Sequence, residues 1–113
     1  MGSCTNLWNA NLRGMDLRKA KLDGVNLRHA DLSFANLNEA TMGGVFLQGA
    51  NLQGAQMKNV VMQESHLEGA TFVGASLTGS DLTMAVTHGV DFSHADLRGT
   101  KLYRHIHASA SLI

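Results

Sequence analysis

Histidine is the side chain in this sequence best suited to acid–base chemistry or metal binding, and the chain contains six. His105 and His107 lie together near the C terminus, and His88 precedes them. No Cys or carboxylate accompanies these three residues at a spacing typical of zinc sites. We therefore expect no metal site and no other cofactor.

Aspartates are the candidates for paired acid–base catalysis. Five of them occupy one recurring position, directly before a Leu or Phe: Asp16, Asp31, Asp81, Asp91 and Asp96. Asp and Asn suit turns in which the side chain bonds the backbone, so a structural role explains this position. The nucleophile-elbow, P-loop and Rossmann glycine patterns are absent from the sequence. We expect no catalytic residue and no enzymatic activity.

The elements that carry these residues repeat every five positions. From Leu7 to Leu102, every fifth residue is Leu, Met or Phe, with Thr87 the exception. We call these residues the central column. Two positions earlier in each repeat, from Ala10 to Thr100, stand Ala, Val, Ser or Thr, with Met15 the exception. This second set is the small column, and both columns together predict a narrow aliphatic core.

A period of five residues excludes a helix and a flat strand. Five residues turn an α-helix about 140° beyond a full turn, so an apolar column of this period would smear around the helix. A flat strand needs a period of two. Ten of the twelve glycines follow a central residue by two positions, where corners would form: Gly14, Gly24, Gly44, Gly49, Gly54, Gly69, Gly74, Gly79, Gly89 and Gly99. The chain must bend once per repeat and wind around the apolar axis.

Like residues recur 20 positions apart, which indicates four repeats per coil. Phe72 and Phe92 form one such pair, and Met42 and Met62 form another. Like side chains stacked on successive coils would produce this spacing.

The sequence resembles the pentapeptide-repeat family, whose pattern is a small residue, Asp or Asn, Leu or Phe, a polar residue and Gly. Residues 50–54 (Ala-Asn-Leu-Gln-Gly) and 95–99 (Ala-Asp-Leu-Arg-Gly) match it fully. The match covers residues 5–113, and residues 1–4 form a short segment that is either native or a remnant of cloning. The resemblance implies an all-β fold, a right-handed quadrilateral parallel β-helix of about five to six coils.

Sorting outward residues by a four-repeat coil singles out one apolar side. Its central residues are Leu7, Leu27, Leu47, Leu67 and Thr87, continued by His107. The outward residues that form the candidate interaction face are Trp8, His29, Phe46, His66, Val86, His88 and Ile106. The side centred on Leu17 and Leu37 carries charged and amide side chains instead, so we expect it to be solvated. Exposed apolar patches often mark interfaces, although single exposed hydrophobes are normal.

The ends of an open solenoid expose backbone and apolar side chains unless they are capped. The register points His105 and His107 inward at the last coil, with Thr87 beneath His107, which favours a polar end cap over a metal site. The chain then closes on apolar residues. The candidate end-to-end contact is His105, His107, Leu112 and Ile113. This end predicts either an end-to-end homodimer or a piece of a larger protein.

Charge limits the kinds of partner that we expect, and cysteine content bears on the cellular location. Nine Lys and Arg balance nine Asp and Glu, so no general attraction to nucleic acid or anionic membrane follows. We expect no direct nucleic-acid binding. No apolar run approaches a membrane span, so no membrane association is expected. A single cysteine, Cys4, cannot form an internal disulfide, which favours a cytoplasmic location.

Three functions remain open. The first is a protein–protein interaction scaffold that uses the candidate face and the C-terminal end, with an unidentified protein partner. The resemblance supplies the second, since some family members mimic duplex DNA and bind DNA gyrase. Such mimicry needs a long acidic surface, which a neutral chain lacks. The third is a structural spacer or a repeat fragment of a larger protein.

Overall fold

The backbone turns a corner at every fifth residue. The computed structural model describes residue 2 and residues 5–103. Every fifth residue from Asn9 to Gly99 has φ between 57° and 71°, and these comprise nine non-glycine and ten glycine residues. This left-handed region is the one that glycine enters without steric cost. The ten glycines predicted at corners all lie there, so this prediction is confirmed.

Every corner from residues 7–10 to residues 97–100 is a β-turn, and all but the one at Met57–Val60 are closed by a direct backbone hydrogen bond. The central residue's carbonyl accepts from the amide three residues later, as in Ala10 N to Leu7 O at 3.0 Å and Ala30 N to Leu27 O at 3.1 Å. A positive φ at the third residue of a four-residue turn is the signature of type II. A turn in each repeat therefore supplies the bend that the period of five predicts, and at Met57–Val60 the Ser80 hydroxyl bridges the carbonyl and the amide.

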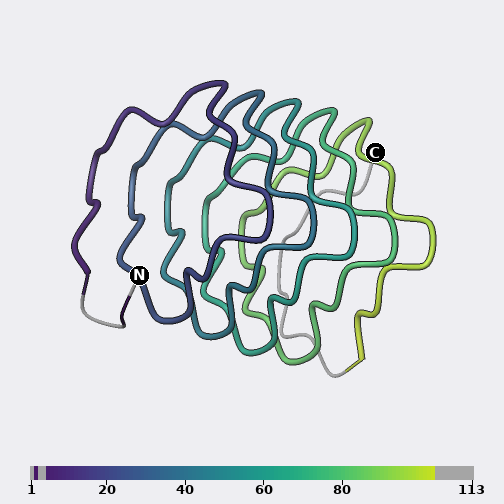
Figure 1. Cartoon of the computed structure of the whole chain (residues 1–113). Coiled ribbons are helices and arrows are strands. Elements are labelled where there is room, and N and C mark those ends of the chain that lie inside the picture. Colours follow the sequence, from purple (N-terminus) through teal and green to yellow (C-terminus); the bar gives the residue numbers. More distant parts are fainter. Residues whose placement is uncertain (1, 3–4, 104–113) are drawn as a thin grey trace.

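Successive coils pair in parallel with a spacing of 20 residues. All sixteen β-bridges of the described residues join residue i to residue i+20, as in the column Asn6, Asn26, Phe46, His66 and Val86. Four repeats per coil are thereby confirmed. Figure 1 shows the coils, coloured purple to yellow, lying side by side in one stack.

Pairing takes the form of isolated bridges and not of long strands. Two of the five residues in each repeat lie in the turn. The remaining three are too short to continue a ladder along one side of the coil. Backbone bonds nevertheless link coils at every repeat, such as Leu27 N to Phe46 O at 2.8 Å and Phe46 N to Val25 O at 3.1 Å. The molecule is a β-solenoid built from short extended pieces.

The core consists of the two predicted columns. Every buried hydrophobic residue in the described part of the chain belongs to the central or the small column, from Leu22 to Phe92, and each is at most 2% exposed. Phe72 and Phe92 stack on successive coils with ring centroids 5.4 Å apart. Leu7, Leu12 and Leu17 in the first coil, and Leu97 and Leu102 in the last described repeats, are only partly buried. The middle coils are therefore the best-buried part of the core.

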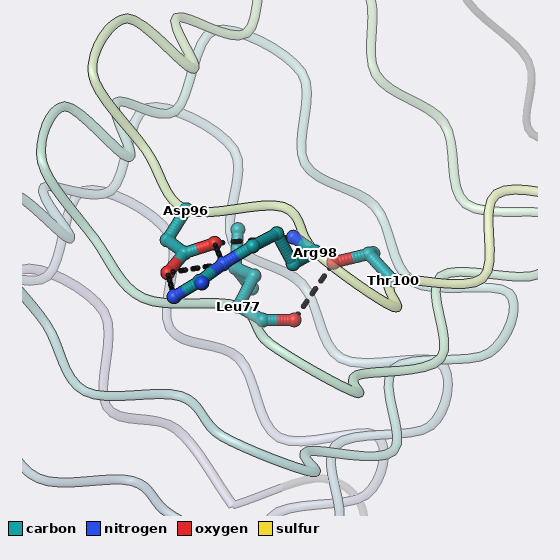
Figure 2. Close-up of polar contacts among 4 residues, drawn as sticks. All are labelled: Leu77, Asp96, Arg98 and Thr100. Carbon is teal, nitrogen blue, oxygen red and sulfur yellow. Dashed lines mark hydrogen bonds and ion pairs between the residues drawn. The ribbon is translucent and has the colours of Figure 1, made fainter.

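Hydroxyl groups in the small column bond to the coil below. Ser80 Oγ donates to Met57 O and accepts from Val60 N at 3.0 Å, so the hydroxyl inserts into the corner of that coil. Thr100 Oγ1 donates to Leu77 O at 2.8 Å, which is visible in Figure 2. Ser65 Oγ is buried in the same column and has no partner. Sequence alone treats these three residues as equivalent small side chains, and the structure separates them.

Within residues 2 and 5–103 no helix is long and apolar enough to cross a bilayer.

Candidate functional site

The side of the solenoid over Leu7, Leu27, Leu47, Leu67 and Thr87 carries two outward columns. One column precedes the central residues, and the other follows them. We call this side the aromatic face. Its described outward residues, apart from the corner positions, are Asn6, Trp8, Asn26, Arg28, Phe46, Gln48, His66, Glu68, Val86 and His88.

A three-membered stack lies at the middle of the aromatic face. The Phe46 and His66 rings are parallel, with centroids 4.8 Å apart and an interplanar angle of 4°. The Arg28 guanidinium lies 4.5 Å from the centroid of the Phe46 ring. The spacing between the two rings matches the distance between adjacent strands. The coil repeat itself therefore sets the stacking distance.

A second aromatic contact lies toward the N-terminal end of the same face. Trp8 meets His29 edge to face, with centroids 6.3 Å apart. The His29 ring lies over Gly49, because a Cβ built there would stand 2.5 Å from His29 Nδ1. Glycine at position 49 is thus favoured by its φ of +69° and by the ring that lies over it.

The structure brings the described members of the candidate interaction face onto one side, with unequal exposure. Trp8 is 57% exposed, and His29 and His88 are also exposed. Phe46, His66 and Val86 are half-buried. Ile106 lies outside the described residues. So does the candidate end-to-end contact of His105, His107, Leu112 and Ile113, as does Cys4.

Sequence reasoning missed two polar residues of the aromatic face. Gln48 and Glu68 follow the central residues of adjacent coils, and the Oε1 atom of each is buried without a hydrogen-bond partner. The 20-residue coil period could have placed both residues on this face. The burial of single side-chain atoms, however, cannot be predicted from the sequence.

Apolar side chains are also exposed away from the aromatic face. Met15, Phe34, Val61 and Met84 are 40–48% exposed, and they are spread over the other sides and corners. The Arg13 guanidinium lies 4.8 Å from the centroid of the Phe34 ring and so covers part of this exposed side chain. The aromatic face is therefore distinguished by its continuous column of Phe46, His66 and Val86, and not by exposure alone.

The Asn and Asp residues before central residues all make the predicted local bond. In ten repeats the side-chain Oδ1 accepts the backbone amide two residues later, at 2.8–3.2 Å. The residues are Asn6, Asn11, Asp16, Asn26, Asp31, Asn36, Asn51, Asp81, Asp91 and Asp96. These aspartates are accounted for by turn geometry.

Donors around the aspartates lower their pKa values. The Arg18 side chain and then the Arg18 backbone amide lower the pKa of Asp16 to about 2. The pKa values of Asp31 and Asp91 are lowered by the hydroxyl and then the amide of Ser33 and Ser93, respectively. Arg98 lowers the pKa of Asp96 through the forked ion pair drawn in Figure 2, at 2.6 Å between Nη2 and Oδ2. A carboxyl held ionised in this way is a poor general acid at neutral pH.

The solvated side is polar, as predicted. Asp16, Arg18, Lys19 and Glu39 line a shallow, wide-open hollow of about 480 Å³ on it. Asp16 and Arg18 pair with each other at 2.8 Å. This hollow does not coincide with the aromatic face. In the described part of the chain, no three His, Cys, Asp or Glu residues are placed to hold a metal ion.

Solved structures with the same fold are pentapeptide repeat proteins. The chain is similar to one from the thylakoid lumen of Arabidopsis thaliana, with 29% identity and a TM-score of 0.76 over 78% of this chain and 61% of that one. A pentapeptide repeat protein of the cyanobacterium Cyanothece 51142 matches at 26% identity and a TM-score of 0.61, over 87% of this chain and 64% of that one.

QnrB1, a plasmid-mediated fluoroquinolone resistance protein, is similar in fold, with 21% identity and a TM-score of 0.71 over 80% of this chain and 45% of QnrB1. This chain spans less than two thirds of the length of each of these three structures. No functionally curated protein sequence matches it significantly.

The family model "Pentapeptide repeats (8 copies)" matches residues 3–33, 30–69, 55–86 and 62–104, and so nearly the whole chain. Together with the five-residue corners and the 20-residue coil, this match shows that the chain belongs to the pentapeptide repeat family.

Proposed function

We propose that this protein is a non-enzymatic, cytosolic interaction scaffold that docks a protein partner on the aromatic face of a right-handed solenoid of five to six coils. The observation that carries the proposal is the column Phe46, His66 and Val86. In three successive coils the position before the central residue holds aromatic or apolar side chains where most repeats hold polar ones.

The apolar members of this column lack the side-chain hydrogen bond to the backbone that Asn or Asp makes at the same position. Asn6 and Asn26, in the same column, each accept the amide of the residue two positions later. Phe46 and Val86 carry no side-chain acceptor, so the amides of Gln48 and His88 receive no such bond. A hydrogen bond of this kind contributes about 0.5–1.5 kcal/mol. The column carries aromatic and apolar side chains at the surface in place of this bond, which fits a binding role.

The scaffold is suited to binding because its face rests on a buried core and its outward side chains pack against one another. The central residues beneath the face, from Leu27 to Thr87, are fully buried. The outward side chains also contact one another across coils, as Arg28, Phe46 and His66 do. Side chains ordered before binding lose less entropy when a partner docks.

Affinity capture with matched variants tests the proposal. The native chain and a Phe46→Asn, Val86→Asn double variant are used as bait in lysate of the source organism. Asn is already present at position 26 of this column, so the variant restores turn bonds and should keep the fold. We expect the native chain to retain a protein that the double variant loses.

The control is a Gln56→Glu, Thr78→Glu double variant on the solvated side, which should retain the same protein. Circular dichroism and thermal unfolding check that each variant is folded. Capture of DNA gyrase would favour the DNA-mimic alternative. Equal capture by all three proteins, or by none, would contradict docking on the aromatic face and favour a spacer.

A further inference from the structure

Two buried oxygen atoms on the aromatic face lack donors. Gln48 Oε1 and Glu68 Oε1 are shut off from solvent, and neither accepts a hydrogen bond. Gly49 N donates to Glu68 O at 3.0 Å, so the two residues lie on directly adjacent coils. Their backbones are thus about 4.8 Å apart. Buried polar atoms are nearly always paired, so two unpaired acceptors on adjacent coils have the capacity to accept hydrogen bonds from an added donor.

The charged groups of this face leave both acceptors unpaired. The Arg28 guanidinium, one coil before Gln48, lies on the Phe46 ring. His66 is stacked on the other side of that ring. His88, one coil beyond Glu68, is exposed. Within coils three to five of the described face, Glu68 is the one carboxylate, and the adjoining outward residues are Phe46, Gln48, His66, Val86 and His88.

From these contacts we infer that Gln48 and Glu68 form the seat for an arginine side chain of the protein partner. This inference rests on the proposed function, and it names the chemistry of the partner. A guanidinium presents several N–H donors in a planar fork, so it can bond an amide oxygen and a carboxylate on neighbouring coils together. A lysine ammonium is a point donor and matches two separated acceptors less well.

The seat is accessible despite the burial of the two oxygen atoms. Gln48 and Glu68 are half-buried as residues, and the terminal torsion of Gln and Glu is broad. A small rotation therefore turns each oxygen toward an incoming donor. The half-buried Phe46 and His66 side chains precede the same central residues, so they supply apolar surface for the methylene groups of the arginine.

The test is titration of the full chain with N-acetyl-argininamide, followed by NMR of backbone and side-chain amides. We expect saturable shifts at the Gln48 side-chain amide and around Glu68, with a dissociation constant of the order of 1–10 mM. N-acetyl-citrullinamide has the same shape without the charge and should bind about ten-fold more weakly. A Glu68→Gln variant should lose affinity to the same extent, and Glu39→Gln on the solvated side should not.

Three results would overturn the seat: no saturable shift, equal binding of the citrulline compound, or shifts at the hollow around Asp16 and Glu39. The outcome is separable from that of partner capture. If the Phe46→Asn, Val86→Asn variant loses the partner while argininamide does not bind at Gln48 and Glu68, the scaffold proposal stands and the arginine seat is wrong.

Discussion

The rings of Phe46 and His66 lie parallel with centroids 4.8 Å apart, and Arg28 covers the opposite side of the Phe46 ring. Because the stack runs along the solenoid axis, the coil repeat and the ring spacing reinforce each other. The stack leaves ring edges, and not ring faces, directed outward from this side. A partner would therefore meet a narrow ridge of aromatic edges flanked by Gln48 and Glu68.

A double-mutant cycle on this stack should show energetic coupling. We expect Phe46→Ala and His66→Ala to interact by about 0.5–1.5 kcal/mol in the free energy of unfolding, because a stacked pair contributes beyond its buried area. Chemical denaturation of the two single variants and the double variant measures it. A cycle between Trp8 and His66 serves as the control and should be additive. Coupling no larger than in the control would mean that the rings are merely neighbours.

Two buried serines of the small column should respond differently to truncation. Ser80→Ala removes a hydroxyl that bonds both Met57 O and Val60 N, so it should lower the free energy of unfolding by about 1 kcal/mol. Ser65→Ala removes a buried hydroxyl without a partner, so it should be neutral or stabilising by up to about 1 kcal/mol. Thermal unfolding of the pair measures both effects. A stability loss at Ser65 equal to that at Ser80 would refute the assignment.

Two corner glycines should also differ. Gly44 has φ +61° and open space where an added methyl group would lie, so Gly44→Ala should cost only the left-handed conformation, about 1 kcal/mol. Gly49→Ala should cost more, because the methyl would meet the His29 ring at 2.5 Å. In a His29→Ala background, the two glycine substitutions should become equal in their effect on unfolding. If the two glycine substitutions still differ in the His29→Ala background, the His29 ring is not the cause of the difference.

The repeat pattern predicted the architecture because each repeat bends for a local reason. The central column, the small column and the corner glycines each depend on one residue and its immediate neighbours. The 20-residue coil followed from Phe72 and Phe92 and is confirmed by the bridges. Isolated bridges in place of strands were not foreseen, since the resemblance implied a β-helix without its pairing detail.

The details of the site were beyond the sequence because they depend on contacts between coils. Period alone placed Phe46, His66 and Val86 in one column. It could not show that Phe46 is covered by Arg28, that Ser65 lacks a partner, or that Gln48 and Glu68 carry buried acceptors. These properties depend on which rotamers fill the space between adjacent turns.

Acid should destabilise the fold through its aspartates. The pKa of Asp16 is lowered from its ordinary value of 3.8 to about 2, and those of Asp31, Asp91 and Asp96 are also lowered. A carboxyl with a lowered folded-state pKa stabilises the protein above its unfolded-state pKa and loses this contribution as pH falls through the folded-state value. The melting temperature should therefore be steady above about pH 5 and fall toward about pH 2.

An Asp16→Asn, Asp96→Asn variant isolates this effect. Asn at the same position keeps the bond to the backbone amide, as Asn36 does, but it no longer titrates. Its melting temperature should fall less steeply between about pH 5 and about pH 2 than that of the native chain. Identical slopes for the two proteins would show that these carboxylates do not control acid unfolding.

The most direct test of the central claim is site-specific photocrosslinking on two matched positions. A photoreactive phenylalanine analogue replaces His88 on the aromatic face or Lys58 on the solvated side. Both residues are exposed and directly follow a central residue. Docking on the aromatic face predicts a crosslinked protein partner from position 88 and none from position 58. A partner crosslinked equally from both positions, or only from position 58, would contradict the assignment of the binding surface.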